Sequence, residues 1–358
     1  MTVISKDALE YFFLSVFKAE GFTDEESSEI ADVLLTADLF GIESHGAQRL
    51  MYYHGNIGSG SVHVGSKPEI IQETPVSALV DGHFGMGQNV SVFGMRLAVK
   101  KAKANGIGMV SVRNSSHFGI AGYYTKMALD AGLAAFSMTN TGKIMVPTFG
   151  REMMLGTNPI AFAMPADPYP FWFDASTTVV TLGKVELYTK LGKTLPTGWA
   201  IRPDGEPQTD ARDVNASVLS GEMGGLLPLG GTGELTSGHK GYGLGIMVEA
   251  LTGILSGGLI SPEMNGAHGD HTSHFFMAFD PSMFGNPETI RNRMSQYLQM
   301  LRDSEKLPGQ SRIYTPGEKA WEHLRQCEQN GICLDDATWA EMNRIACELG
   351  IEPPKGLH

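Results

Sequence analysis

Two short segments of the sequence each place one histidine between small polar residues and glycine. Residues 41–46 contain His45, and residues 114–119 contain His117. Histidine exchanges a proton near neutral pH, so either side chain could act as the acid or base of an enzyme. Small neighbours leave room for a ligand, and glycine allows the backbone to approach it closely. The alternative is a simple turn, which is the more frequent setting of a histidine beside serine and glycine.

Arg49 follows His45 by four residues. Its planar guanidinium can bind a carboxylate through two parallel hydrogen bonds. We therefore consider Arg49 a candidate for holding the carboxylate of an acidic substrate.

Further segments carry polar groups that a ligand could use. Residues 174–178 place hydroxyls beside a carboxylate, which suits a ribose or phosphate and equally suits a helix N-cap. Lys240 follows a glycine-rich stretch and precedes an apolar helix, where it would contact a cofactor phosphate or stay solvated. Residues 156–159 have the composition of a tight turn, and residues 316–318 that of a turn with a helix start.

Three histidines spaced by three residues, His268, His271 and His274, raise the question of a metal site. That spacing would place them on one face of a helix. Gly266 and Gly269 disfavour a helix, so we expect a loop that leads into a strand, and no metal. A metal-dependent lyase or hydrolase is the alternative from a different class of function.

The remaining sequence predicts the elements that position these residues. Apolar residues at helical spacing predict helices in the first 50 residues, and Thr23 with Glu26 forms a possible capping box. Alternating strand and helix signals follow and indicate an α/β core. The expected strands are 77–81, 108–112, 133–139 and 159–165, with helices at 90–104 and 120–131. Residues 192–213 and 221–238 read as loops, followed by helices at 244–255, from 290, at 321–329 and at 337–349.

Composition excludes several classes of protein. The chain has 358 residues, enough for about two domains, and 42% are hydrophobic. Its net charge of −12 disfavours nucleic acid as a partner. The absence of a long apolar run predicts no membrane span. Three cysteines near the C-terminal end and no signal-peptide pattern indicate a reduced, cytoplasmic protein.

Familiar catalytic and nucleotide-binding motifs are missing. No G-x-G-x-x-G follows a strand, and residues 241–245 have the wrong spacing for it. The string at 192–194 resembles the end of a P-loop, but Leu187 stands where its first glycine is required. A G-x-S-x-G nucleophile elbow is also absent, which weakens a serine hydrolase interpretation.

Seven strings nevertheless recur in a familiar order: GIESHGAQR (41–49), NSSHFG (114–119), GTNPIAF (156–162), FDAST (173–177), GK (183–184), GHKGYG (238–243) and YTPGE (314–318). In combination they resemble the malate/L-lactate dehydrogenase family of the non-Rossmann type. That family also includes 2,3-diketogulonate reductases, ureidoglycolate dehydrogenases and sulfolactate dehydrogenases. The strings run over nearly the whole chain, so the resemblance is specific at the level of the family.

The resemblance implies a fold distinct from that of the Rossmann dehydrogenases. It implies a central α/β domain that binds cofactor and substrate, together with a helical domain built from both termini. We place the boundaries at residues 1–75 for the N-terminal helical part, 76–284 for the central domain and 285–358 for the C-terminal helices. A homodimer is also implied.

The resemblance also assigns roles to individual residues. Ser44, His45, Arg49 and Tyr53 would lie at the substrate site, and either His45 or His117 would be the catalytic acid and base. Positions that would contact the nicotinamide cofactor are Thr141, Asp174, Ala175, Ser176, Lys240, Pro316, Gly317 and Glu318. Lys143 and residues 177–182 depart from many relatives, which could alter the choice of substrate or cofactor.

Together these features predict an NAD- or NADP-dependent oxidoreductase of small 2-hydroxy or 2-oxo acids. Malate and oxaloacetate are the expected pair. Lactate, 2,3-diketogulonate or ureidoglycolate is the alternative within the same family. Hydride transfer belongs to the nicotinamide, so the protein must hold the substrate carboxylate and move one proton.

Overall fold

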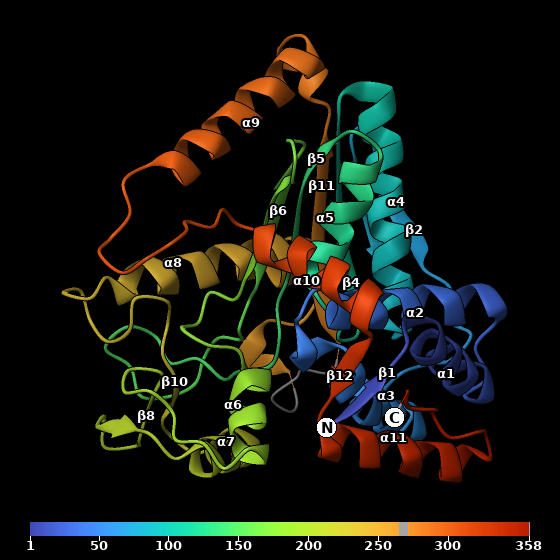
Figure 1. The fold of residues 1–358 in the computed structure, drawn as a ribbon, viewed down its shortest axis with the longest axis vertical. Helices are drawn as coiled ribbons and strands as arrows, with labels where there is room; N and C mark the ends of the chain where they lie inside the picture. The colour runs from blue at the N-terminus through green and yellow to red at the C-terminus, as the bar shows by residue number, and fades with distance from the viewer. Residues whose placement is uncertain (265–270, 358) are drawn as a thin grey trace.

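The computed structural model describes residues 1–264 and 271–357, and a seven-stranded mixed sheet forms its centre (Figure 1). The parallel pair is β3 with β4, and the other neighbours run antiparallel. In spatial order the strands are β2 (Glu69–Glu73), β3 (Ser77–Asp81), β4 (Ile107–Ser115), β11 (Thr272–Phe279), β5 (Ala134–Thr139), β6 (Ile160–Met164) and β7 (Phe171–Ala175). This mixed order confirms the predicted α/β class, and it is not the parallel order of a Rossmann domain.

Helices cover the sheet on both faces. On one face lie α4 (Gly87–Asn105) and α5 (Ala121–Asp130), whose small and branched apolar residues pack into one core with the strands. Against the other face lie α8 (Gly238–Glu249) and a π-helix (Ala250–Ile254). The apolar helix predicted at 244–255 therefore begins earlier, at the glycine-rich string that contains Lys240.

Both ends of the chain contribute to a second core. It contains α1 (Lys6–Ala19), α2 (Asp24–Leu39), α3 (Leu50–Gly58) and α11 (Asp336–Leu349). The first strand, β1 (Thr2–Ile4), pairs with β12 (Ile332–Leu334) and joins the two termini directly (Figure 1). The predicted capping box of Thr23 and Glu26 is present at the start of α2.

Of the remaining C-terminal helices, α10 (Glu318–Asn330) reaches that core with Cys327 and Leu324, and α9 (Pro287–Asp303) lies apart from it. α10 crosses beside α2, where Phe40 packs against Trp172 and Trp321. α9 projects outward at the upper left of Figure 1, and Leu298 is its one buried side chain.

A small unit contains parts of the two stretches expected to be loops, 192–213 and 221–238, together with the residues between and before them. A three-stranded sheet of β10 (Gly225–Leu226), β8 (Ala200–Ile201) and β9 (Pro207–Gln208) packs with α6 (Leu182–Lys190) and α7 (Ala211–Ser220). Each strand is only two residues long, so its sequence carries no alternation to detect.

Two further findings concern the chain as a whole. Within the described residues, none of the helices combines the length and apolar character that crossing a membrane requires. All three cysteines are free thiols, of which Cys327 is buried and the other two are exposed.

Candidate active site

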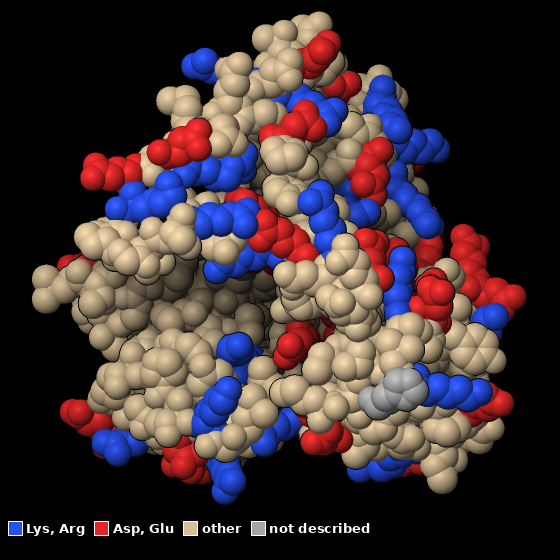
Figure 2. Space-filling view, in the orientation of Figure 1, with Lys and Arg blue, Asp and Glu red and all other residues tan. Residues whose placement is uncertain are grey.

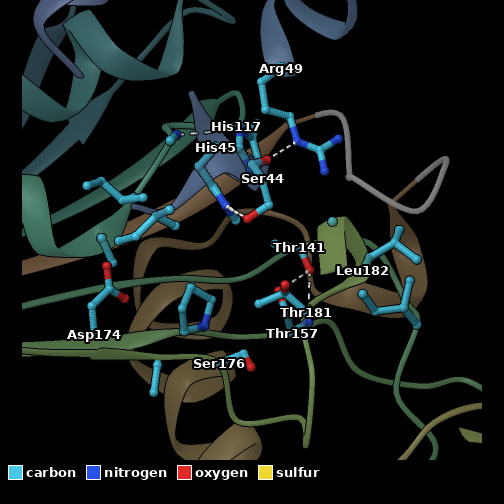
Figure 3. Close-up of a pocket in the computed structure, with 18 residues that line it drawn as sticks. Ser44, His45, Arg49, His117, Thr141, Thr157, Asp174, Ser176, Thr181 and Leu182 are labelled. Carbon is cyan, nitrogen blue, oxygen red and sulfur yellow. Dashed lines mark hydrogen bonds between the residues drawn. The ribbon is translucent and has the colours of Figure 1, made fainter. Parts of the chain in front are cut away.

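A cavity of about 230 Å³ lies where the N-terminal helices, the ends of β5 and β7, and the start of α6 meet. Figure 3 shows Ser44, His45, Arg49 and His117 on one side of it, with Asp174 and Ser176 on the opposite side. Eight predicted site residues therefore meet around one space: Ser44, His45, Arg49, His117, Thr141, Asp174, Ala175 and Ser176.

The segment that carries Ser44 and His45 is fixed to the end of α2 by Asp38. Two 3₁₀ turns, Glu43–His45 and Ala47–Arg49, follow the helix, and the backbone N–H of Ala47 donates to Asp38 Oδ2 at 2.8 Å. A Cβ at Gly46 would lie 2.0 Å from Asp38 Oδ1, so only glycine fits there. Burial raises the pKa of Asp38 to about 8.

The two histidines lie next to each other. Their ring centroids are 5.6 Å apart and the rings are stacked. Ser44 Oγ is 2.8 Å from Nδ1 of His45, and the Tyr53 hydroxyl is 2.7 Å from Nδ1 of His117. The geometry thus places His45 and His117 side by side, with Tyr53 directly behind the second ring.

The hydrogen bonds of His117 indicate its tautomer. The backbone N–H of Gly119 donates to Nδ1 at 3.4 Å, so Nδ1 is an acceptor and the neutral ring carries its proton on Nε2. The Tyr53 hydroxyl then also donates to Nδ1. His117 follows β4 in the connection to α5, which is where the strand and helix signals had placed it.

Arg49 is nearly buried and is held by the protein on two sides. Its Nε donates to the carbonyl of Ser44 at 2.8 Å, and its Nη2 is paired with the carboxylate of Glu186 in α6. A Cβ at Gly183 would lie 2.7 Å from Nη2 of Arg49, so the first turn of α6 packs directly on the guanidinium. A substrate carboxylate would approach an arginine whose charge is already shared with Glu186.

The carboxylate of Asp174, in β7, caps the start of helix α5. Its Oδ2 accepts the backbone N–H of Gly122 at 2.7 Å, in the first turn of α5. Burial raises the pKa of Asp174 to about 6, and this hydrogen bond opposes the rise. The alternative of an N-cap at 174–178 is wrong for the helix that follows, since Thr181 caps α6.

Four predicted cofactor residues do not line the cavity. Lys240 is exposed in the first turn of α8. Pro316 and Gly317 lie beside β7, where the backbone N–H of Trp172 donates to the carbonyl of Pro316 at 3.3 Å. Glu318 is buried, accepts the backbone N–H of Thr315, and pairs with arginine, so its carboxylate is engaged within the protein.

The histidine string gives little support to a metal site. His268 lies outside the described residues. His274 is buried. The Thr139 hydroxyl lies 2.8 Å from its Nδ1, and the Ser115 hydroxyl lies 2.8 Å from its Nε2. Burial lowers the pKa of His274 to about 3. His274 lies in strand β11, in agreement with the strand expected after the histidine string.

Several residues at the site escaped the sequence analysis. Thr157 and Gly183 line the cavity, Glu186 pairs with Arg49, and Asp38 anchors the histidine segment. Gly183 and Thr157 each stood in a matching string, but neither was given a role there. Glu186 and Asp38 belong to no motif. An acidic residue within a helix usually faces solvent, so nothing in the sequence marked either one as a site residue.

Comparison with known proteins yields consistent matches over the full chain. Residues 4–343 match the family described as malate/L-lactate dehydrogenase. A malate dehydrogenase of Pyrococcus horikoshii is 44% identical over 98% of this chain and 96% of its own. A ureidoglycolate dehydrogenase (NAD(+)) of Escherichia coli strain K12 is 31% identical over 93% of both. The crystal structure of a malate dehydrogenase from Entamoeba histolytica superposes with a TM-score of 0.96 at 34% identity, covering 99% of this chain and 100% of that one.

Proposed function

Because the chain belongs to the malate/L-lactate dehydrogenase family, we propose that it moves a hydride between a nicotinamide cofactor and C2 of a small 2-hydroxy or 2-oxo acid. The observation that carries the proposal is the cavity itself. It brings a histidine pair and Arg49 to one side and the Asp174–Ser176 segment to the other. Acid binding and proton transfer therefore face the residues proposed to hold the cofactor.

On the substrate side, Arg49 supplies the positive charge for the carboxylate. His117, once doubly protonated, would give a proton to the oxygen at C2 and return to the neutral ring, and His45 beside it is the other candidate for that role. Ser44 orients His45 through Nδ1, and Tyr53 orients His117. The cofactor supplies the hydride when it is bound.

The opposite side offers groups that fit a nicotinamide nucleotide. Asp174 and Ser176 provide a carboxylate and a hydroxyl for ribose, while Thr141 adds a hydroxyl. The cavity is smaller than the ~300–1,000 Å³ of a typical drug-sized pocket, so most of a dinucleotide would extend outside it. Figure 2 shows a hollow between α8 and α6 with Lys and Arg side chains above and below it, which suits phosphates.

Lys240 and the turn Pro316–Glu318 stay proposed cofactor contacts on the strength of the resemblance. Lys240 is exposed on α8 and would serve the phosphates. Pro316 and Gly317 lie along β7 near Asp174 and would approach through their backbone. Glu318 would act by holding that turn, since its carboxylate is already bonded to Thr315.

Malate and oxaloacetate are the proposed pair, because relatives at 43–44% identity are named malate dehydrogenase. NAD is the proposed cofactor, since a relative carries it in its name, with NADP as the alternative. Lactate, 2,3-diketogulonate or ureidoglycolate would be the substrate in the runner-up proposals.

We further propose a cytoplasmic homodimer. The free thiols suit a reducing compartment. Exposed apolar side chains on α8, its π-helix and α9 suit a contact with a second copy. They include Ile246, Met247, Ile254, Leu255, Tyr297 and Met300.

The test is the oxidation of NADH and of NADPH against oxaloacetate, pyruvate and 2,3-diketogulonate. We expect the highest kcat/KM with oxaloacetate. A preference for another acid would replace malate within the same family. Protein that binds neither nucleotide and oxidises neither would contradict the proposal.

A further inference from the structure

A buried carboxylate lies behind the cofactor side of the cavity, at the last residue of α8. Glu249 is 8% exposed, and its two oxygens accept four hydrogen bonds. The donors to Oε1 are Asn140 Nδ2 at 2.8 Å and the backbone N–H of Ser261 at 2.9 Å. The donors to Oε2 are Asn158 Nδ2 and Ser261 Oγ, both at 2.8 Å.

A carboxylate without a charged partner is costly to bury unless donors satisfy it. These four donors come from three separate segments, namely the end of β5, the Gly156–Pro159 turn and the 3₁₀ turn Ser261–Glu263. The π-helix begins at the next residue, Ala250, and single π turns are frequent at functional sites. Such an arrangement fixes three segments to one side chain.

The network continues to the cavity in two ways. Asn158 is fully buried, and its Oδ1 accepts the backbone N–H of Thr141 at 3.3 Å. Ser261 Oγ accepts the backbone N–H of Gly156 at 3.0 Å, next to Thr157. The backbone N–H of Thr157 in turn donates to Thr141 Oγ1 at 3.0 Å. Thr141 and Thr157 both line the cavity.

We propose that Glu249 is the positioning residue for the cofactor-facing side of the cavity, acting through Asn158 and Ser261 on Thr141 and Thr157. The inference rests on the proposed function, in which Thr141 contacts the nicotinamide cofactor. Glu249 itself touches neither substrate nor cofactor.

The substitution Glu249→Gln tests the route through the network. The backbone N–H of Ser261 cannot reverse its direction, so the amide oxygen of glutamine must stay at the Oε1 position. The new NH₂ then faces Ser261 Oγ, which can rotate to accept, and Asn158 Nδ2, which cannot. Asn158 has to flip, and its NH₂ then opposes the backbone N–H of Thr141. Thr141 is therefore displaced.

We expect the dissociation constant for NADH or NADPH to rise about tenfold in Glu249→Gln, the size of one disrupted hydrogen bond. The KM for the 2-oxo acid at saturating cofactor should change less than twofold. Ser261→Ala, which removes a single bridging hydroxyl, should weaken cofactor binding by about threefold. It supplies the measurement if Glu249→Gln does not fold.

Thr252→Val is the matched control. Thr252 is buried in the same π-helix, where its Oγ1 donates to the carbonyl of Val248 at 2.7 Å. The variant should lose stability and keep the cofactor affinity of the wild type.

Cofactor affinity is measured directly by fluorescence titration of the full-length protein without substrate. Wild-type protein that binds cofactor, with unchanged affinity in both Glu249→Gln and Ser261→Ala, would overturn the inference alone. Equal weakening in Thr252→Val would overturn it too, because the effect would then be one of stability. Wild-type protein that binds neither nucleotide would overturn the proposed function and the inference with it.

Discussion

The hydroxyl of Tyr53 donates a hydrogen bond of 2.7 Å to Nδ1 of His117. Tyr53 is buried in α3, and burial raises the pKa of its hydroxyl well above the ordinary value, so the hydroxyl stays protonated at every physiological pH. The neutral imidazole is thereby kept with its proton on Nε2. Uptake of a second proton gives the imidazolium, which can pass one proton to an oxo acid in the cavity and return to the neutral ring.

The first prediction concerns this pair. His117→Ala should lower kcat about 10²–10⁴-fold, the usual contribution of general acid–base catalysis. Tyr53→Phe should lower it less, by about tenfold, because the ring remains but loses one of its two donors. Steady-state kinetics at saturating cofactor measures both.

His45→Ala is the comparison that identifies the acid. A larger loss of kcat in His45→Ala than in His117→Ala would assign the proton transfer to His45. Near-full kcat in both variants would refute the proton-transfer role of the pair.

The second prediction concerns the pair of Arg49 and Glu186. Glu186→Gln keeps an acceptor for Nη2 but removes a negative charge from the guanidinium. A substrate carboxylate should then bind more tightly, and we expect the KM for the 2-oxo acid to fall several-fold with kcat nearly unchanged. Arg49→Lys should instead lower kcat/KM strongly, because it loses the planar fork. A raised KM in Glu186→Gln would mean that Glu186 orients Arg49 and does not compete for it.

Local signals predicted much of the fold. Strand β3 has the bounds expected, and the capping box of α2 is present, because apolar spacing and capping residues are close together in the sequence. The unit around β8, β9 and β10 escaped prediction. Its two-residue strands form because Ile201 and Leu226 are buried against α6 and α7, and that packing leaves no local pattern.

The residues of the site likewise divide into those that local sequence signals predicted and those that they did not. Residues in glycine-flanked strings, such as His45 and His117, were predicted and do meet. Residues that act through distant partners were not. Glu186 is 137 positions from Arg49, and Glu249 is 91 from Asn158, so only the folded chain shows those contacts.

The third prediction is a pH dependence of cofactor binding. The pKa of Asp174 is raised to about 6, so its carboxylate loses its charge as the pH falls through that value. Ribose hydroxyls bind more strongly to the ionised form. We expect affinity for NAD(P)H to be about tenfold weaker at pH 5 than at pH 7.

Asp174→Asn should bind more weakly and show no such dependence. Fluorescence titrations between pH 5 and pH 8 measure both proteins. An unchanged pH profile in Asp174→Asn would assign the titration to another group.

The last prediction concerns stability and Asp38. The pKa of this carboxyl is about 8 in the folded protein against an ordinary value of 3.8, because burial and the nearby Glu43 disfavour the ionised form. Between these values the unfolded chain has released the proton and the folded chain keeps it. The stabilisation is therefore complete below about pH 4 and is lost as the pH rises through 8.

Wild-type protein should accordingly lose about 1.4 kcal/mol of unfolding free energy per pH unit between pH 5 and pH 7, and less per unit as the pH reaches 8, relative to Asp38→Asn. The asparagine keeps an oxygen for the backbone N–H of Ala47 and has no proton to lose in this range. Urea denaturation at each pH measures the difference, and Glu25→Gln, at an exposed position in the first turn of the same helix, should match the wild-type slope. Parallel curves for wild type and Asp38→Asn would show that Asp38 is ionised in the folded protein, and the anchor of the His45 segment would then be a charged one.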